Sequence, residues 1–306
     1  MKVSVFMMTY NHEPFIAQAI ESVLAQDTPF DLELVIGEDQ SADGTRRICE
    51  EYRSRFPDRI RLLPGDRRIG QMRNFARTIN ACRGTYIAKL EGDDYWIEPK
   101  KLQMQAEFLD NHPDVVLHYT NAVAFDEGQP EKRQVMIAPG EREPFIGVED
   151  LVRGNQVVTQ TCMYRNLAPW NLPPLFLKGT QGDWPFFCLL ARHGKIAFTD
   201  EVTGAYRRHG GGVFTRRSDT EKLYKNAMTH EAIDRMLGFR YRCIAAPIIR
   251  SKYLKVYHYG MASREWRYAV PGALRLIRRA IVDRCPPPEL RRIIRGLMPA
   301  RFRKLD

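Results

Sequence analysis

The sequence predicts an α/β fold, in which a mostly parallel β-sheet is flanked by helices and followed by a helical, basic C-terminal region. Two observations predict it. Strand-like and helix-like segments alternate through the first 120 of the 306 residues, which is typical of βαβ units. Residues 239–306 contain 17 Lys and Arg against 4 Asp and Glu, so they carry +13 in a chain of net charge +10 and leave −3 for residues 1–238.

The first strands and helices follow from their apolar patterns. Residues 2–10 form an apolar run of strand length, and residues 13–26 repeat apolar side chains at helical spacing. Residues 31–39 are a second apolar run, which ends in acids. Residues 43–56 begin with Asp-Gly-Thr, where helix capping is needed, and are predicted to be the second helix.

The alternation continues through the first half of the chain. A short strand is predicted over residues 60–65 and a helix over residues 71–82. Residues 84–94 begin as a buried strand and end in the acids of "EGDD". A helix over residues 100–113 and a strand over residues 114–125 follow, so the order of elements predicts successive βαβ units.

The remaining segments are less regular. Residues 127–147 are charged and rich in Pro and Gly, which predicts a mobile loop. Residues 182–194 have the apolar content of a packed helix, and residues 206–217 form a glycine-rich basic loop. Residues 272–284 place Leu and Ile on one side and Arg on others, which predicts an amphipathic helix.

The composition indicates a globular protein. The chain is 44% hydrophobic and 27% charged, and no apolar run approaches the roughly 20 residues of a membrane span. The run from Val3 to Met8 is too short for the apolar core of a secretion signal. No C-x-x-C pair is present, so we expect no zinc site and interpret the cysteines as free thiols in a reducing cytosol. They are Cys49, Cys82, Cys162, Cys188, Cys243 and Cys285.

Polar side chains follow three of the predicted strands. Thr9 and Asn11 lie at the end of the first strand, Asp39 at the end of the second, and residues 91–94 at the end of the fourth. Ligands of parallel α/β sheets bind at the carboxyl ends of the strands, where these side chains are expected to meet. The sequence therefore predicts one binding site at this edge of the sheet.

Four stretches, in this order, carry a resemblance to a known family. They are "VSVFMMTYNHEPFIAQAIESVLAQ", "LVIGEDQSADGT", "RIGQMRNFARTINACRGTYIAKLEGDDYW" and "GDWPF". Together they resemble the inverting glycosyltransferases of family 2, which have the Rossmann-like GT-A fold and depend on nucleotide sugars. The resemblance covers roughly residues 3–110 and 180–210. The Q-x-x-R-W signature of processive polysaccharide synthases is missing, which favours the addition of one sugar or a few.

The resemblance implies a role for each part of the chain. Residues 1–120 are expected to be the nucleotide-sugar-binding half of the GT-A domain, and residues 121–215 its acceptor-binding half. Residues 216–306 form the helical basic region. Amphipathic helices with Arg on the polar face bind anionic membranes, so this region is expected to contact such a surface or another subunit.

The acids after the fourth strand fit a divalent cation. When a sugar leaves a nucleotide diphosphate, the pyrophosphate gains charge, which Mn²⁺ or Mg²⁺ held by carboxylates can neutralise. We expect Asp93 to be the direct metal ligand. The resemblance implies that Glu91, where the family more often has Asp, contacts the ribose or the metal shell. It also implies that Asp94 orders the loop or contacts the donor sugar. The alternative is a solvated acidic turn.

The nucleotide is expected to contact the neighbouring strand ends. Asp39 can accept a hydrogen bond from a uracil-like ring N–H or a ribose hydroxyl, and Thr9 and Asn11 can frame the base. Arg73, which opens the third helix, can pair with phosphate or stack on the base. The alternative for Asp39 is helix capping, a role that we assign to Asp43.

An inverting transfer needs a base, because the acceptor hydroxyl loses its proton as it attacks. The resemblance gives this role to Asp183 of "GDWPF". The alternative is that Asp183 lies at the start of a helix, and this position is compatible with its role as the base. Arg207 and His209 lie beside a glycine run that suits a lid over the diphosphate, and His209 can complete the metal shell or bind a phosphate oxygen. The other six histidines receive no assignment.

These assignments predict a metal-dependent inverting glycosyltransferase. The donor is a nucleotide diphosphate sugar, and UDP is the commonest nucleotide of the family. The acceptor is a hydroxyl of a glycan or of a lipid-linked glycan in cell-surface polysaccharide synthesis. We expect the enzyme in the cytoplasm, peripheral on the inner face of the plasma membrane through residues 239–306. A homodimer contact or solvated helices are the alternatives for this region.

Three other functions fit the sequence less well. A sugar-1-phosphate nucleotidyltransferase needs an N-terminal glycine-rich loop, and "MTYNHEP" contains no glycine. A non-enzymatic nucleic-acid or membrane-binding protein explains the basic region but leaves the acids of the buried strand unexplained. Carboxylates repel phosphate, so no nucleic acid is expected as a partner. A catalytically inactive scaffold is disfavoured by the presence of both Asp93 and Asp183.

Overall fold

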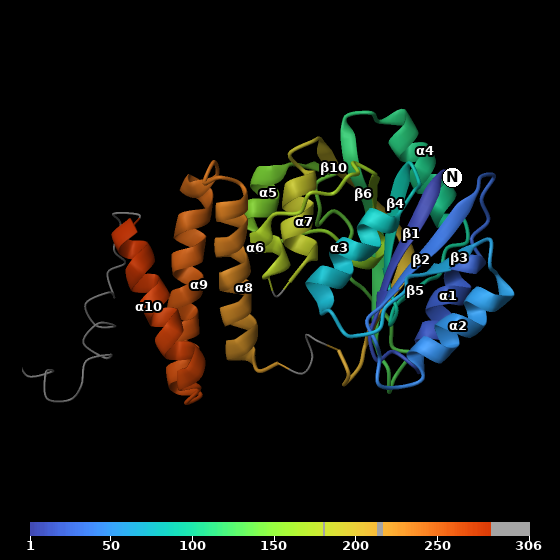
Figure 1. Cartoon of the computed structure of the whole chain (residues 1–306). Coiled ribbons are helices and arrows are strands. Elements are labelled where there is room, and N and C mark those ends of the chain that lie inside the picture. The colour runs from blue at the N-terminus through green and yellow to red at the C-terminus, as the bar shows by residue number, and fades with distance from the viewer. Residues whose placement is uncertain (180, 213–216, 283–306) are drawn as a thin grey trace, which may run out of the picture. The chain divides into compact units, whose positions relative to one another are not determined.

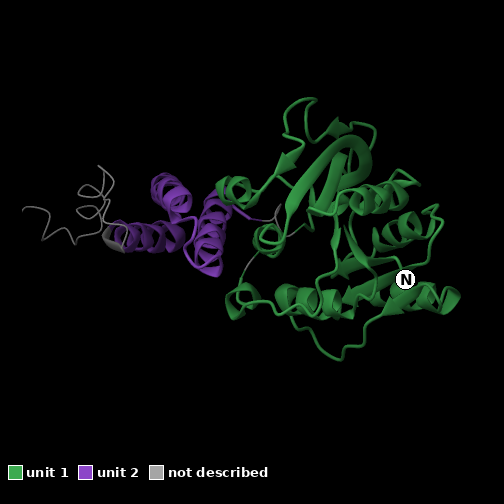
Figure 2. Ribbon diagram, turned by 90° about the horizontal axis from the view of Figure 1, so that it is seen from above, with its two compact units in different colours: residues 1–215 green, residues 216–306 purple. Residues whose placement is uncertain are grey.

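The computed structural model describes residues 1–179, 181–212 and 217–282, drawn in colour in Figure 1. The chain forms two compact units, residues 1–215 and residues 216–306 (Figure 2). Residue 120, where the sequence places a boundary between two halves of the first unit, lies within strand β6 (Val115–Asp126). The two expected halves therefore share one sheet.

The first unit contains a ten-stranded sheet with the order β3-β2-β1-β4-β9-β6-β10-β5, to which β7 and β8 add at β6 and β10. Thr9 pairs with Glu38 across β1 and β2, and Met8 pairs with Glu91 across β1 and β4, so three strands end at one edge. The predicted α/β fold with a mostly parallel sheet is confirmed. The parallel strands at this end are β1 (Val3–Thr9), β2 (Leu32–Glu38), β3 (Ile60–Leu62) and β4 (Tyr86–Glu91).

Several antiparallel strands were not predicted from the alternation of elements. Strand β9 (Met163–Arg165) lies antiparallel between β4 and β6, and β10 (Lys195–Arg208) continues parallel to β6. Strand β5 (Tyr95–Trp96) pairs antiparallel with β10. Two short antiparallel strands, β7 (Gln134–Val135) and β8 (Phe145–Ile146), correct the expectation that residues 127–147 form only a loop. A segment that runs along β6 or β10 can form backbone hydrogen bonds with that strand, whatever the composition of the segment.

Helices cover both faces of the sheet. Val5 and Ala88 belong to a core cluster whose helical side chains come from α1 (Ile16–Leu24), α2 (Thr45–Arg55) and α4 (Lys101–Asn111). Phe6 points to the opposite face, where its ring centroid lies 5.0 Å from that of Phe75, which in turn lies 5.1 Å from that of Phe186. The helices of this second face are α3 (Gln71–Ala81), α6 (Pro174–Leu177) and α7 (Asp183–Leu190), with α5 (Val148–Arg153) beside α7.

The second unit consists of three described helices, α8 (Asp219–Met236), α9 (Arg242–Ala262) and α10 (Trp266–Val282). Hydrogen bonds and ion pairs join them: Glu231 accepts hydrogen bonds from the Tyr253 hydroxyl at 2.8 Å and from Arg275 at 2.7 Å. Arg279 donates to Asp234 at 3.0 Å. The structure thus bears out a helical C-terminal region as far as residue 282, and the rest of the basic region, 283–306, lies outside the described residues.

Two expectations about the whole chain can be compared with the described residues. The described residues include five cysteines, all of them unpaired, and four of these are buried. Cys285 lies outside the described residues. Among the described residues, no helix combines the length and apolar content that crossing a bilayer requires.

Candidate active site

A cavity of about 400 Å³ opens at the carboxyl ends of β1, β2 and β4. Eight of the ten residues that the sequence places in the site line it: Thr9, Asp39, Glu91, Asp93, Asp94, Asp183, Arg207 and His209. Asn11 is not among the lining residues, and its Oδ1 accepts a hydrogen bond from the Ala42 amide at 2.9 Å. Arg73 is also not among them and is exposed on α3.

Gly92 allows the loop after β4 to lie against the end of β1. A Cβ atom at this position would lie 2.6 Å from Thr9 Oγ1, which is shorter than real Cβ contacts, and 3.0 Å from His12 Nδ1, which is a tight contact. The glycine of "EGDD" therefore brings Asp93 close to His12. Thr9 Oγ1 and His12 Nδ1 are buried and have no hydrogen-bond partner among the described residues.

Two imidazoles flank the carboxylate of Asp93. Its Oδ2 lies 3.1 Å from His209 Nε2 and 3.6 Å from His12 Nε2. Burial opposes ionisation of Asp93, but the hydrogen bond from His209 and the charge of His12 outweigh it and hold the pKa of Asp93 below its ordinary value. Burial lowers the pKa of His12, although Asp93 acts in the opposite direction. His12 is thus a member of the site that sequence analysis missed.

The donor atoms around Asp93 fit a divalent cation in part. Asp93 offers a carboxylate oxygen and His209 an imidazole nitrogen, both of which are metal ligands. No set of three His, Cys, Asp or Glu side chains in the described part of the chain is arranged to hold a metal by itself. Mn²⁺ and Mg²⁺ commonly complete their shells with water and substrate phosphates, so two protein donors are compatible with such a site.

Asp94 and Arg207 join the loop after β4 to β10. Asp94 Oδ1 accepts a hydrogen bond from the Arg207 amide at 2.9 Å, and Arg207 Nε donates to the Asp93 carbonyl at 3.1 Å. The Arg207 guanidinium also lies 4.8 Å from the ring centroid of Phe15 and 3.7 Å from Glu127. Burial, reinforced by the charge of Asp93, raises the pKa of Asp94 well above its ordinary value. The guanidinium expected over the diphosphate is therefore engaged in these protein contacts.

Asp39 organises the loop that leads into α3. Its buried carboxylate accepts hydrogen bonds from the amides of Ile69 at 2.8 Å and Gly70 at 2.9 Å. Gly70 has φ of +87°, a conformation that favours glycine. Each carboxylate oxygen has a second lone pair, so Asp39 can still accept from a ligand. Asp39 thus lines the cavity while it binds the residues that directly precede α3, whereas Asp43 accepts from the Thr45 amide at 3.0 Å at the start of α2.

Arg68 occupies the place in the cavity wall that the sequence gives to Arg73. Its guanidinium lies 4.0 Å from the ring centroid of Tyr10, and its Nε lies 4.0 Å from Asp39 Oδ2. Both Arg68 and Tyr10 line the cavity. A planar base can stack on such an arginine–tyrosine pair. Arg68 precedes the glycine at position 70, so the course of this loop decides which arginine faces the cavity.

Asp183 is the first residue of α7 and reaches the floor of the cavity. Its Oδ1 lies 3.1 Å from Lys89 Nζ, and its side chain is 33% exposed. Lys89 also pairs with Glu91, and its own side chain is fully buried. Burial raises the pKa of Glu91 to about 7, against the lowering effect of Lys89. Sequence analysis missed Lys89, although a lysine within the apolar run "YIAKL" is a signal.

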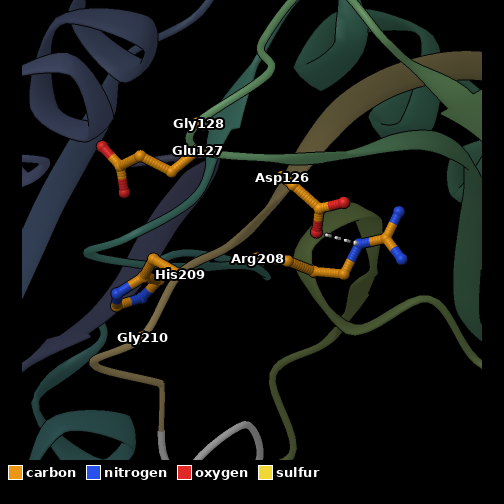
Figure 3. Close-up of a pocket in the computed structure, with 6 residues that line it drawn as sticks. All are labelled: Asp126, Glu127, Gly128, Arg208, His209 and Gly210. Carbon is orange, nitrogen blue, oxygen red and sulfur yellow. Dashed lines mark ion pairs between the residues drawn. The ribbon is translucent and has the colours of Figure 1, made fainter.

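His209 lines a second cavity as well. This cavity has a volume of about 340 Å³, and Figure 3 shows its six lining residues at the ends of β6 and β10. In Figure 3 the side chains of Asp126 and Arg208 point toward each other, and their ion pair measures 3.4 Å. His209 and Glu127 lie on the other side of the view. His209 therefore lines both this space and the cavity that contains Asp93.

Comparison with solved structures defines the class of protein. TarS of Staphylococcus aureus in complex with UDP-GlcNAc aligns with a TM-score of 0.56 at 18% identity, over 83% of this chain and 67% of TarS. The mannosyltransferase PcManGT of Pyrobaculum calidifontis, in complex with GDP-Man and Mn²⁺, gives 0.58 at 14% identity, over 95% and 82%. Such identities show the fold alone, and the fold is that of GT-A glycosyltransferases. The chain therefore has the fold of glycosyltransferases that were solved with nucleotide sugars bound.

Comparison of sequences gives the family. Residues 4–165 match the model of glycosyl transferase family 2, and the chain belongs to that family. An uncharacterized protein of Mycobacterium tuberculosis strain H37Rv is 32% identical over 253 residues, which are 78% of this chain and 70% of the relative. The chondroitin synthase of Escherichia coli is 26% identical over 76% of this chain and 33% of its own length.

Proposed function

We propose that the protein transfers a sugar, with inversion and with the help of a divalent cation, from a UDP-sugar to a hydroxyl of a glycan or lipid-linked glycan. The observation that carries this proposal is the single cavity that contains Asp39, Asp93 and Asp183. These carboxylates suit three different tasks, because they lie on different elements and have different neighbours. TarS, which was solved with UDP-GlcNAc, and PcManGT, solved with GDP-Man and Mn²⁺, support a donor of this kind.

The proposed chemistry is a single displacement. Asp183 Oδ1 faces Lys89, and the other carboxylate oxygen has no hydrogen-bond donor among the described residues. This oxygen takes the proton of the acceptor hydroxyl as the hydroxyl attacks the anomeric carbon, from the face opposite the diphosphate. Asp93 and His209 hold Mn²⁺ or Mg²⁺, which, when bound, neutralises the charge on the leaving diphosphate. Asp39 accepts a hydrogen bond from the nucleoside, and Arg68 with Tyr10 borders its base.

Nucleotide diphosphates are expected to stabilise the protein in a metal-dependent way. At about 100 times its Kd a ligand contributes about 2.7 kcal/mol, which corresponds to a rise in Tm of about 5–10 °C for a domain of this size. UDP with Mn²⁺ should give this rise in a thermal-shift assay, and EDTA should abolish it. A larger shift with GDP or dTDP would show that the donor nucleotide is different. No shift with any of the three would contradict the proposed site.

We also propose that α10 contacts an anionic membrane, which would bring the enzyme to lipid-linked acceptors at the cytoplasmic face. Trp266, Val270 and Leu274 recur at every fourth residue and are 53%, 36% and 57% exposed, while Ala269 and Leu276 on the same helix are buried. Residues 239–282 contain 10 Lys and Arg and a single acid. An exposed apolar stripe within a basic region is typical of helices that lie on anionic bilayers. The alternative is a dimer contact through the same apolar stripe, and sedimentation experiments distinguish it from the membrane contact.

Replacing Trp266 and Leu274 with Ser is expected to weaken co-sedimentation with vesicles that contain phosphatidylglycerol by about 10-fold or more. Each side chain contributes roughly 2 kcal/mol when it leaves water. Val135→Ser, which removes a 52% exposed apolar side chain from the first unit, is the matched control and should leave binding unchanged. Equal binding of the parent and the double variant would contradict the membrane contact. A dimer of the parent chain in sedimentation experiments that the double variant lacks would favour the dimer instead.

A further inference from the structure

Lys89 is a charged residue at an apolar position of a central strand. Strand β4 has neighbours on both sides, and the Lys89 amide donates to the Cys162 carbonyl of the adjoining segment at 3.0 Å. The side chain points to the sheet face that carries Phe6, with Nζ 5.7 Å from the centroid of that ring. Neither the stem nor the ammonium is exposed to solvent. An uncompensated ammonium in such a place costs several kcal/mol, so its partners determine whether it is tolerated.

Two carboxylates compensate this charge. The ammonium pairs with Glu91, two residues further along β4, and with Asp183 Oδ1 at 3.1 Å on α7. Burial alone would lower the pKa of Lys89, but Asp183 and Glu91 outweigh it and hold the pKa above its ordinary value. Without the ammonium, the two carboxylates that it joins would line one cavity with no cation between them, and their repulsion would favour rotation of one of them away from the other.

A second buried lysine has different partners. Lys101 at the start of α4 is also fully buried, but its ammonium contacts the amide oxygen of Gln105 and lies 4.3 Å from the centroid of the Trp96 ring. Burial lowers the pKa of Lys101 to about 7. The chain therefore contains one buried lysine with two acidic partners at the active site and one without a carboxylate partner away from it. The second provides a matched control for the first.

We infer that Lys89 is a positioning residue for Asp183, an inference that rests on the proposed role of Asp183 as the base. The ammonium binds Oδ1 and leaves the other oxygen free to receive the proton of the acceptor. It also joins α7, which carries the base, to β4, which leads to Asp93. The acceptor hydroxyl and the leaving diphosphate are thereby held in a fixed orientation relative to each other.

The inference predicts a defect in the chemical step and little change in donor binding. Lys89→Met leaves an unbranched side chain that is one heavy atom shorter and has no charge, and it is expected to lower kcat about 100-fold, as loss of orientation does. The Kd for UDP-sugar with Mn²⁺ should stay within about 3-fold of the parent value, which also shows that the variant is folded. Lys101→Met should retain the parent kcat. Where Lys89→Met does not fold, Lys89→Gln, which retains a hydrogen-bond donor without the charge, makes the same comparison.

Chemical rescue tests the ammonium group, with its charge and its hydrogen-bond donors together. In Lys89→Ala the missing atoms correspond to n-propylammonium, and this ion should restore kcat about 10-fold or more with saturation. Tetramethylammonium at the same ionic strength cannot donate a hydrogen bond and should have no effect. A merely structural role for Lys89 predicts that neither ion restores the rate. Failure of n-propylammonium to restore kcat in a folded Lys89→Ala protein would overturn the inference.

A double-mutant cycle separates the inference from the proposed function. In an Asp183→Asn protein there is no carboxylate to position, so adding Lys89→Met should lower kcat by less than about 3-fold. A full 100-fold loss in that background would show that Lys89 acts independently of Asp183, and the inference would be wrong. If Asp183→Asn alone keeps the parent rate, the base assignment is wrong. If Asp183→Asn is inactive while Lys89→Met keeps the parent kcat, only the inference about Lys89 fails.

Discussion

Asp183→Asn is expected to lower kcat for sugar transfer about 10³-fold while the donor still binds. A general base contributes roughly 10²–10⁴-fold, and an amide cannot take the proton of the acceptor hydroxyl. The substitution keeps the shape of the side chain, and Glu91 remains as a carboxylate partner of Lys89. Donor affinity should therefore change little, because the nucleotide and metal contacts lie on other elements. Single-turnover transfer and calorimetric titration with UDP-sugar measure the two quantities separately.

Asp219→Asn is the matched control for this experiment. Asp219 is the first residue of α8, as Asp183 is of α7, but its side chain is 84% exposed. Both substitutions remove an acid that interacts favourably with a helix N-terminus, an effect of about 0.3–1 kcal/mol on stability. Only the change at Asp183 should affect turnover. Parent-like turnover in a folded Asp183→Asn protein would exclude Asp183 as the base.

The main features of the site follow from the sequence because parallel strands end at one edge. Thr9, Asp39 and Asp93 are separated by tens of residues, but each follows an apolar run that forms a strand of the same sheet. Register then brings them together: β1 pairs with β2 on one side and with β4 on the other. The sequence could therefore predict the fold class and eight of the sixteen residues that line the cavity. It could not predict β9 between β4 and β6, because β9 follows β6 in the chain and enters the sheet out of sequence order, which an alternation of strands and helices does not indicate.

The residues that sequence analysis misplaced depend on local backbone geometry. Arg68 and Arg73 are five positions apart, and the glycine at position 70, with its positive φ, lies in the loop that turns the first of them toward Tyr10. His12 reaches Asp93 only because the residue before Asp93 has no side chain. The partners of Arg207, among them Phe15 and Glu127, are distant in sequence. No periodicity encodes such contacts.

Asp93→Ala is expected to remove the metal-dependent part of donor binding. The parent should bind UDP-sugar at least about 10-fold more tightly with Mn²⁺ than with EDTA, because the cation joins the diphosphate to the protein. In the variant the two affinities should be equal and close to that of the parent in EDTA. Removing Asp93 also leaves His209 and His12 without the carboxylate between them, so direct Mn²⁺ binding, measured by electron paramagnetic resonance without nucleotide, should weaken as well.

His209→Ala and His12→Ala determine which imidazole acts with Asp93. His209 is the closer of the two to Asp93 Oδ2, at 3.1 Å against 3.6 Å, and its loss should weaken Mn²⁺ binding more than the loss of His12. Lys101→Met serves again as a control that should leave both Mn²⁺ and donor binding at the parent level. An Asp93→Ala protein whose donor affinity still rises with Mn²⁺ as in the parent would show that the cation is held elsewhere. The acids after β4 would then need another explanation, such as the solvated turn.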